Sequence, residues 1–381
     1  MKKEFFCKPS TPFDCAQDRP LRSGYTTGAC ATAAAKGAAL MLKHQITINE
    51  VTIELPAGGS ATFHLSGQNY SINSATCFVL KDAGDDPDVT NGAEVHATVS
   101  RVTDTLPDCA DKIIIEGGMG IGRVTKPGLA VPPGEWAINP VPRKMIDEAV
   151  ASAVFPTTDS RTRITDTFHV TISIPDGEEL AKKTLNARLG IIGGLSILGT
   201  TGIVRPISAK AWTDTLDAAL DVAKACGCET VVLSTGRTSE MAAQRWLKYF
   251  SEEAYIMMGD HIAYALKACQ RRGFKQPIIA CQFAKLLKIA CGHENTHAVA
   301  SELDLEQLLA WAQQDGLSDL TLATIFNANT AREIAVASSF DPVLLELVFQ
   351  HARCSVGEHA PDITTHFLVA DYSGNCIFDS R

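Results

Sequence analysis

The sequence lacks the excess of positive charge and the long apolar runs that mark two large classes of protein. Its 34 Lys and Arg residues are outnumbered by 43 Asp and Glu residues, which gives a formal net charge of −9. A general nucleic-acid binder needs a basic face that replaces the counterions of phosphates. No apolar stretch reaches the roughly 20 residues that cross a bilayer. We therefore expect no nucleic-acid partner and no membrane partner.

The first 20 residues lack the apolar core of a secretory signal peptide. They are charged and interrupted by proline, and we interpret residues 1–20 as a flexible leader before the fold. The 12 cysteines do not form the repeated CxxC pattern of a structural zinc site, and we expect reduced thiols in a cytoplasmic protein. Cys291, His293 and His297 come nearest to a metal pattern. A substrate contact or a helix cap is the preferred interpretation, and no protein-bound metal is predicted.

Two nucleotide-binding motifs are also missing. The absence of GxGxxG argues against a classical NAD domain. The absence of GxxxxGK[ST] weakens a small-molecule kinase, although other kinase folds remain open. The acidic segment "KDAGDDPDVTNG" lacks the spacing and the closing glutamate of an EF-hand. We interpret it as a polar turn that positions one carboxylate at a ligand.

The chain changes its rhythm near residue 190. Before that point strands and loops alternate, with a hairpin predicted at Val51–Leu55 and Ala61–Leu65. After it, short apolar strands alternate with helices, which indicates crossover units and a parallel sheet. The predicted class is mixed α/β, with an N-terminal α+β domain over 21–195 and a Rossmann-like α/β domain with a mainly parallel sheet over 196–381. The boundary is expected in the glycine-rich segment "LNARLGIIGGLSILGTTGIVRP".

The individual elements follow from these patterns. The other strands are predicted at Ala75–Lys81, Ala93–Val102, Lys112–Glu116, Phe168–Ile174, Thr230–Ser234, Ala254–Met258 and Pro277–Gln282, with a last strand in "THFLVADYSG" expected at a sheet edge. Helices are predicted at Ala29–Lys43, Arg143–Val154, Thr213–Ala225, Ser239–Lys248, Ile262–Arg271, Glu302–Gln313 and Asp341–Ala352.

Ligands of open parallel sheets bind beyond the carboxyl ends of the strands. In the second half those ends carry "STGRTSE", "MGD" and "CQF". Gly236 allows a tight turn, Arg237 offers a planar fork of donors, and Asp260 could accept both hydroxyls of a ribose. The candidate residues for a nucleoside cofactor are Thr235, Gly236, Arg237, Thr238, Gly259 and Asp260. The alternative is that Thr238 caps a helix and Asp260 belongs to a solvated turn.

Two features of the first half suggest an anionic ligand. The glycine- and proline-rich segment Glu116–Ile146 includes the cations Arg123, Lys126 and Arg143. The run "GYTTGACATAAAKGAAL" begins an alanine-rich helix whose small side chains permit close approach to a neighbour. Tyr25, Thr26, Thr27 and Gly28 stand before or at its start, where free N–H groups attract carboxylate or phosphate. The alternatives are a solvated loop and a packed helix without a ligand.

Seven segments in this order resemble the cobalt-precorrin-5B C1-methyltransferase (CbiD-type) family over about Leu21–Tyr372. They are "SGYTTGACATAAAKGAA", "DAGDDPDVTNGAE", "GGMGIGRVTKPGLAVPPGEWAINPVPRKMI", "LNARLGIIGGLSILGTTGIVRP", "STGRTSE", "GDHIAYAL" and "KLLKIACGHENTHA". Cys291 and His293 stand in a segment that is plainer in the family, and residues before Leu21 lie outside the pattern.

The resemblance implies methylation of a ring carbon of a cobalt-bearing tetrapyrrole by S-adenosylmethionine, with cobalt as part of the substrate. The domain over 21–195 would then bind the tetrapyrrole, and the domain over 196–381 would bind the methyl donor. Candidate bases that could adjust substrate protonation are Asp82, Asp85, His293 and His297. A homo-oligomer and transient contacts with neighbouring pathway enzymes are further expectations. A small-molecule kinase and a non-catalytic corrinoid carrier remain as alternatives.

Overall fold

The computed structural model describes residues 20–103, 112–155 and 166–381, and the chain divides into two compact units. The chain passes between the units repeatedly, so the division differs from the single boundary expected at residue 195. The first unit contains residues up to 121, 138–183 and 194–207, and the second contains 122–137, 184–193 and 208–381. The segments 122–137 and 184–193, which were expected in the first domain, therefore belong to the second unit.

The first unit is built around a five-stranded sheet in the order β4-β5-β6-β9-β7. Its neighbouring strands are antiparallel except for β7 and β9, which are parallel. A separate hairpin pairs β2 with β3, as predicted. The elements of this unit are β1 (Gly24–Tyr25), α1 (Thr27–His44), β2 (Glu50–Glu54), β3 (Ser60–His64), β4 (Ser66–Tyr70), β5 (Ser74–Leu80), β6 (Glu94–Thr103), β7 (Lys112–Gly117), α2 (Pro140–Val154), β9 (Asp166–Ser173), α3 (Gly177–Ala181) and β11 (Ile203–Val204).

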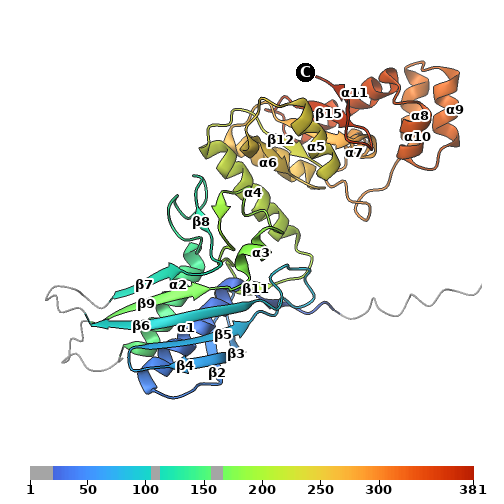
Figure 1. Ribbon diagram of the computed structural model, residues 1–381. Coiled ribbons are helices and arrows are strands. Elements are labelled where there is room, and N and C mark those ends of the chain that lie inside the picture. The colour runs from blue at the N-terminus through green and yellow to red at the C-terminus, as the bar shows by residue number, and fades with distance from the viewer. Residues whose placement is uncertain (1–19, 104–111, 156–165) are drawn as a thin grey trace, which may run out of the picture. The chain divides into compact units, whose positions relative to one another are not determined.

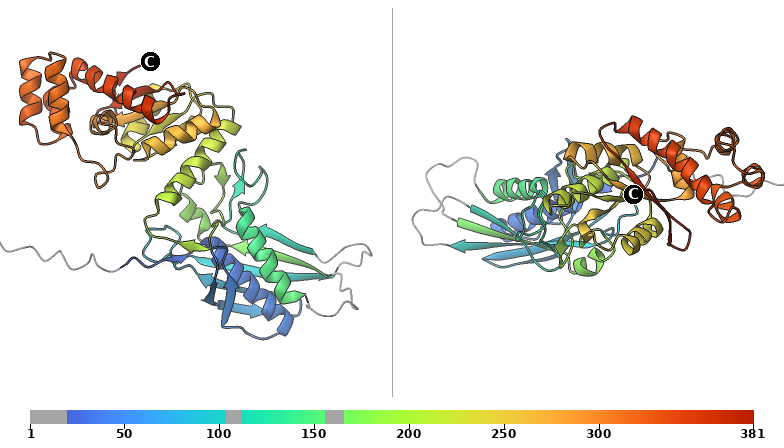
Figure 2. Two further views of the ribbon diagram at one scale, coloured as in Figure 1. Left: turned by 180° about the vertical axis from the view of Figure 1, so that it is seen from behind. Right: turned by 90° about the horizontal axis from the view of Figure 1, so that it is seen from above.

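Helices α1 and α2 lie side by side on one face of this sheet (Figures 1 and 2). The small residues of α1 explain the close packing. A Cβ on Gly37 would come within 2.3 Å of Leu65 Cδ1. On the sheet, the Cys77 thiol donates to the Ala34 carbonyl at 3.2 Å, so the strand reaches the helix backbone. The prediction that this alanine-rich helix serves close approach is confirmed.

The second unit contains a second five-stranded sheet in the order β13-β12-β14-β15-β16. Strands β13, β12, β14 and β15 pair in parallel, and β16 is antiparallel to β15. The mixed α/β class is therefore confirmed. The elements are β8 (Arg123–Val124), β10 (Ile191–Ile192), α4 (Ala209–Ala225), β12 (Val232–Ser234), α5 (Arg237–Trp246), η1 (Glu252–Ala254), β13 (Tyr255–Met257), α6 (Ile262–Arg272), β14 (Ile278–Gln282), α7 (Phe283–Ala290), α8 (Leu305–Gln314), α9 (Asp319–Asn327), α10 (Ala331–Ala337), α11 (Pro342–His359), β15 (His366–Ala370) and β16 (Cys376–Asp379).

The expected position of the last strand is wrong. "THFLVADYSG" supplies β15, which lies between β14 and β16, and the edge strand is β16. The residues from Phe367 to Ala370 are all buried. Phe367 and Val369 pack with residues of α7 and α11 on one face of the strand, and Leu368 and Ala370 pack with α5 on the other. A continuous apolar run of this kind is typical of an interior strand of a parallel sheet.

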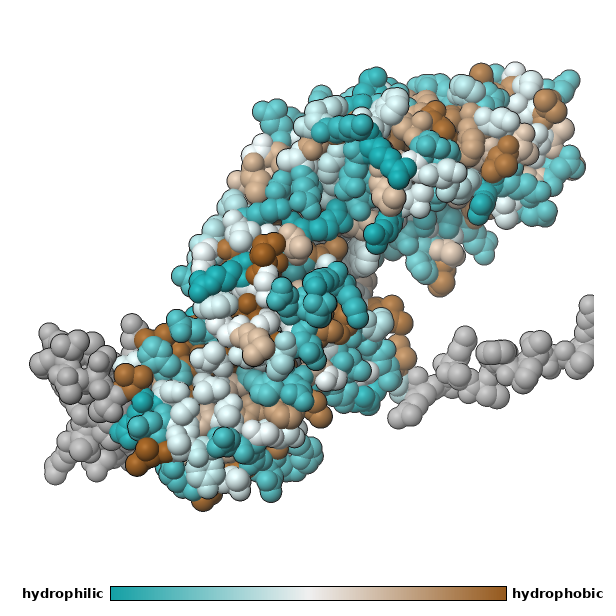
Figure 3. All heavy atoms as spheres, viewed as in Figure 1, coloured by the Kyte–Doolittle hydropathy of each residue, from teal (hydrophilic) through white to brown (hydrophobic). Residues whose placement is uncertain are grey.

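The two faces of this sheet have separate cores. Ala242 and Ala243 of α5 pack with Val232 and Ile278 on one face. Residues of α4, α6, α7 and α11 pack on the other face, around Leu233 and Ile279. In the view of Figure 3 hydrophilic side chains predominate on the surface, and apolar ones are scattered among them, some at the end formed by α8, α9 and α10. Within the described residues, no helix is long and apolar enough to cross a membrane.

Candidate functional site

The strand order of the second unit creates a topological switch point between β12 and β14. The chain leaves β12 through α5 on one face, and it leaves β14 through α7 on the opposite face. The two connections separate at the carboxyl ends of β12 and β14, and such crevices bind ligands in open α/β sheets. Thr235, Gly259 and Gln282 stand at or just after the ends of β12, β13 and β14.

The start of α5 is an uncapped helix end. Gly236 is its N-cap, no side chain caps the helix, and a Cβ on Gly236 would meet nothing within 4 Å. The backbone of Gly236 is extended (φ −176°), a conformation that any residue adopts, so the two-residue bend between β12 and α5 does not depend on glycine. Thr238 and Ser239 lie inside the helix instead of capping it, and Ser239 Oγ donates to the Gly236 carbonyl at 2.9 Å. The positive end of the helix therefore has no side-chain cap and has open space beside Gly236, which favours an anionic group.

Ser234 ends β12 as a fully buried residue. Its carbonyl accepts from the N–H groups of Met258 and Gly259, at 2.9 and 3.2 Å. Its hydroxyl has no hydrogen-bond partner among the described residues. A buried hydroxyl without a partner is unusual, and its presence at the switch point fits a site for a polar ligand.

Asp260 follows β13 and is held by two side chains of other elements. Thr296 Oγ1 donates to Oδ1 at 2.8 Å, and Lys285 of α7 forms an ion pair with the same oxygen. Burial alone would raise the pKa of this carboxyl, but the hydrogen bonds from Lys285 and Thr296 lower it below its ordinary value. The carboxylate is therefore ionised at neutral pH. Lys285 and Thr296 both donate to Oδ1, so Oδ2 can accept a hydrogen bond from a ligand hydroxyl.

A second lysine of α7 lies beside this ion pair. Lys288 is buried, and its Nζ donates to the carbonyls of Ser301 and Thr296, at 2.8 and 3.2 Å. Burial and the charge of Lys285 lower its pKa. The sequence prediction missed Lys285, Lys288 and Thr296. The i, i+3 spacing of the lysines in "KLLK" was the available signal, because it places both on one face of a helix.

The two candidate histidines lie in the loop after α7. His297 is exposed, and its Nδ1 accepts from the Val299 N–H at 3.3 Å. His293 is partly exposed and donates its main-chain N–H to the Lys288 carbonyl. Cys291 is the C-cap of α7, which agrees with the helix-cap interpretation. Across the part of the chain that the structure describes, no group of three His, Cys, Asp or Glu side chains is arranged to hold a metal.

Asp82 and Asp85, in the first unit, both bind Arg22. The Arg22 guanidinium contacts Asp82 at 2.5 and 2.8 Å, and the Arg22 main-chain N–H donates to Asp85 Oδ2 at 2.6 Å. The hydrogen bond from Arg22 lowers the pKa of Asp82. A lowered pKa makes a carboxylate a weaker base at neutral pH, so this geometry favours a structural role for Asp82 over a catalytic one.

The start of α1 differs from the expected anion site because its N–H groups are already used. Those of Tyr25, Thr26 and Gly28 donate to the carbonyls of Asp82, Gly202 and Leu198, respectively. Thr26 Oγ1 accepts from Ala29, and Thr27 Oγ1 accepts from the Leu198 N–H at 3.0 Å. Thr26, Thr27 and Gly28 are buried, whereas Tyr25 is partly exposed. The expectation of free N–H groups at this helix end is wrong.

The three candidate cations belong to different units. Arg143 lies in the first unit on α2 and donates to the Ile115 carbonyl at 3.0 Å. In the second unit, Arg123 stacks over Trp136 at 3.9 Å, and Lys126 pairs with Glu253 at 2.9 Å. Glu253 neutralises Lys126, whereas Arg123 and Arg143 have no carboxylate partner among the described contacts.

The segment Glu116–Ile146, which was expected to form one long loop, contains regular secondary structure. It contains β8, which pairs with β10, and α2 begins at Pro140. Gly128 packs on α4, where an added Cβ would come within 2.5 Å of the Asp221 carbonyl oxygen.

Together, the fold and the site define a two-unit α/β protein with a candidate ligand-binding edge at the carboxyl ends of the parallel strands of its second unit. The chain belongs to the CbiD family. The CbiD family model matches residues 14–206, and the model of the CbiD C-terminal domain matches residues 295–381.

Relatives with a named activity are similar over nearly their whole length. The cobalt-precorrin-5B C(1)-methyltransferase of Pelobacter propionicus is 59% identical over 94% of this chain and 96% of its own. The enzyme of that name from Geobacter sulfurreducens is 56% identical over 94% of this chain and 99% of its own. A crystal structure of the cobalamin biosynthesis protein CbiD from Archaeoglobus fulgidus is 30% identical, covers 78% of this chain and 85% of its own, and has a TM-score of 0.37.

Proposed function

We propose that this protein methylates C1 of cobalt-precorrin-5B with S-adenosylmethionine to give cobalt-precorrin-6A, in the anaerobic branch of cobalamin biosynthesis. The observation that carries the proposal is the identity of 59% and 56% to relatives named for this activity, over 94% of the chain. Methyl transfer breaks a carbon–sulfur bond and forms a carbon–carbon bond with an electron pair from the macrocycle. The protein mainly has to align the reactants and exclude water.

The methyl donor is proposed to bind at the carboxyl edge of the second unit, as in a Rossmann-like domain. The uncapped start of α5, with Thr235, Gly236, Arg237 and Thr238, suits the carboxylate of the methionine portion. Asp260, with Gly259 before it, would accept the ribose hydroxyls through Oδ2. The unpartnered hydroxyl of Ser234 supports a polar ligand at this edge.

The tetrapyrrole is proposed to bind through its acetate and propionate groups. Arg143 of the first unit is the proposed anchor, because it has no carboxylate partner among the described contacts. Lys126 and the segment Tyr25–Gly28 then have a structural role, because their polar groups bind other parts of the protein. If substrate protonation must be adjusted, His297 is the preferred base, because its imidazole is exposed and imidazole is the side chain that most often serves as a general base.

The direct test is incubation of the purified protein with cobalt-precorrin-5B and S-adenosylmethionine carrying a deuterated methyl group, without oxygen. Mass spectrometry should find a macrocycle that has gained one deuterated methyl group. A macrocycle of unchanged mass contradicts the proposal.

Calorimetry separates the alternative classes. A methyltransferase should bind S-adenosylhomocysteine, a kinase should bind ATP, and a corrinoid carrier should bind neither.

A further inference from the structure

An exposed tryptophan is fixed next to the proposed ribose site. Trp212 lies in the first turn of α4, and its indole N–H donates to the Met258 carbonyl at 2.9 Å. The ring rests on Gly259, where a Cβ would approach it to 2.8 Å. Gly259 also has a φ of +60°, which favours glycine. The His261 ring lies 6.4 Å from the indole, centroid to centroid, and Trp212 nevertheless remains 44% exposed.

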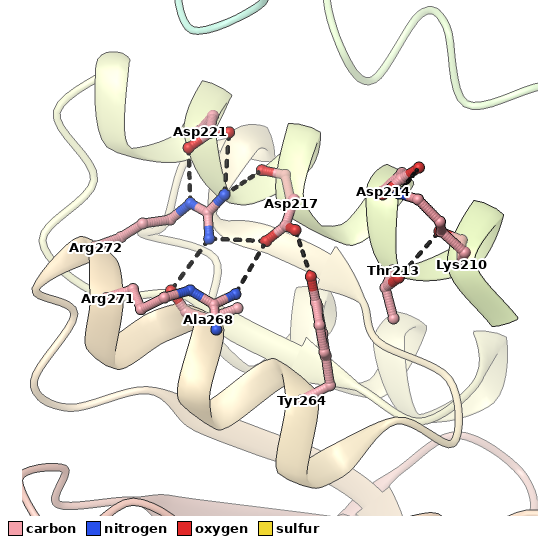
Figure 4. Close-up of polar contacts among 9 residues, drawn as sticks. All are labelled: Lys210, Thr213, Asp214, Asp217, Asp221, Tyr264, Ala268, Arg271 and Arg272. Carbon is pink, nitrogen blue, oxygen red and sulfur yellow. Dashed lines mark hydrogen bonds and ion pairs between the residues drawn. The ribbon is translucent and has the colours of Figure 1, made fainter. Parts of the chain in front are cut away.

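Helix α4 itself is tied firmly to α6, which follows the same loop. Arg272 binds Asp221 through two hydrogen bonds of 2.7 and 3.0 Å and pairs with Asp217 at 2.8 Å. The Tyr264 hydroxyl donates to Asp217 at 2.5 Å (Figure 4). The position of Trp212 relative to the loop after β13 is therefore fixed by two sets of contacts, its own hydrogen bond to Met258 and the polar contacts between α4 and α6.

On the basis of the proposed function, we infer that Trp212 is the stacking platform for the adenine ring of S-adenosylmethionine. Asp260, the proposed ribose ligand, is the residue after Gly259, and the adenine ring is bonded directly to the ribose. A flat base next to Asp260 therefore lies within reach of the indole. Aromatic side chains bind bases through their faces with little dependence on hydrogen bonding.

The experiment compares Trp212→Ala and Trp212→Phe with the wild type. Calorimetry measures the affinity for S-adenosylhomocysteine and for 5′-methylthioadenosine, which keeps the adenosine and lacks the amino-acid portion. Trp212→Ala should weaken both ligands by on the order of tenfold. Trp212→Phe keeps an aromatic face but loses the bond to Met258, and it should weaken them by about threefold or less.

Trp246→Phe is the matched control. Trp246 is 54% exposed and its indole N–H also binds a protein oxygen, Asp379 Oδ2 at 2.8 Å, but it ends α5 at the far end of that helix from Gly236. S-adenosylhomocysteine should quench the tryptophan fluorescence of the wild type and of Trp246→Phe. The quenching should be lost in Trp212→Phe.

The outcomes distinguish the two proposals. Equal affinity in the wild type and Trp212→Ala overturns the platform while leaving the cofactor site in place. Equal losses in Trp212→Phe and Trp212→Ala overturn it in favour of a role in holding the loop. A wild type that binds neither adenosine ligand contradicts the proposed cofactor itself, and the platform with it.

Discussion

Lys81 and Asp88 show how a single buried cation organises an acidic loop. The Lys81 ammonium contacts Asp88 Oδ2 at 2.6 Å, and the Lys81 side chain is only 1% exposed. Asp88 Oδ1 also accepts from the main-chain N–H and the hydroxyl of Thr90, at 2.8 and 2.6 Å. The acidic segment "KDAGDDPDVTNG" thus contains its own positive charge.

Replacing Asp88 with asparagine should destabilise the fold in a pH-dependent way. Burial pushes the pKa of Asp88 up, but the hydrogen bonds from Lys81 and Thr90 bring it below its ordinary value. Stability from this carboxylate is therefore present above the unfolded pKa of about 3.9 and is lost as pH falls through the lower folded pKa. Leaving Lys81 unpaired should cost roughly 3 kcal/mol in urea unfolding at pH 7. The difference from the wild type should shrink below about pH 4.

Asp214→Asn is the control for this measurement. Asp214 pairs with Lys210 on the surface, with side chains 52% and 74% exposed, respectively. Such pairs contribute about 0–1 kcal/mol. An equal loss in both variants at pH 7 would contradict a special role for the Lys81–Asp88 pair.

Asp260 should matter for the methyl donor more than for the fold. If its Oδ2 binds the ribose, Asp260→Ala should raise the dissociation constant of S-adenosylhomocysteine at least tenfold, or about 1.4 kcal/mol, in calorimetry. Thr296→Val removes one partner of Oδ1 and keeps the carboxylate, so its effect should be smaller. A change below tenfold in Asp260→Ala rejects Asp260 as a ribose ligand.

At the scale of elements, local patterns predicted most helices and strands well. Helix α6 spans Ile262–Arg272 against a predicted Ile262–Arg271, and Gly273 ends it with a φ of +76°. The β2–β3 hairpin has the predicted alternation, with Val51 opposite Phe63 and Ile53 opposite Ala61. These elements were predictable because a cap or a period of two is a local property of the chain. The place of β15 depends on distant partners, and there the prediction was wrong.

A pair of glycines tests the close packing of α1. Gly37→Ala should destabilise the protein by about 1 kcal/mol or more, because the new methyl group clashes with buried Leu65. Gly357 lies in α11, another 18-residue helix, and an added Cβ there meets nothing within 4 Å. Gly357→Ala should instead stabilise the protein by up to about 1 kcal/mol. Urea unfolding measures both, and a stabilised Gly37→Ala variant would contradict close packing.

At the scale of the whole molecule, each unit has its own sheet and its own buried side chains. The chain has four tryptophans, at positions 136, 212, 246 and 311, and all of them lie in the second unit. Tryptophan fluorescence therefore reports on the second unit, whereas far-ultraviolet circular dichroism reports on both.

This distribution yields a prediction about ligand binding. S-adenosylhomocysteine at 100 times its dissociation constant should stabilise the second unit by about 2.7 kcal/mol. In urea unfolding, the fluorescence transition should move to higher concentration. Part of the dichroism transition should stay in place if the first unit unfolds by itself. A dichroism transition that moves while the fluorescence transition stays in place would mean that the ligand stabilises the first unit alone. This result would contradict the placement of the donor site.

The sequence alone determined the mixed α/β class, most element positions and the resemblance to the CbiD family, because these depend on local periodicity and on ordered motifs. It also pointed to the carboxyl ends of the strands, since loops after parallel strands gather at one edge. Only the tertiary structure decided which polar groups at this edge are free to bind a ligand and which already bind other parts of the protein. Long-range hydrogen bonds use the N–H groups of α1, place Lys285 on Asp260, and set Trp212 beside Gly259. Such pairings join residues far apart in the chain, so no local pattern contains them.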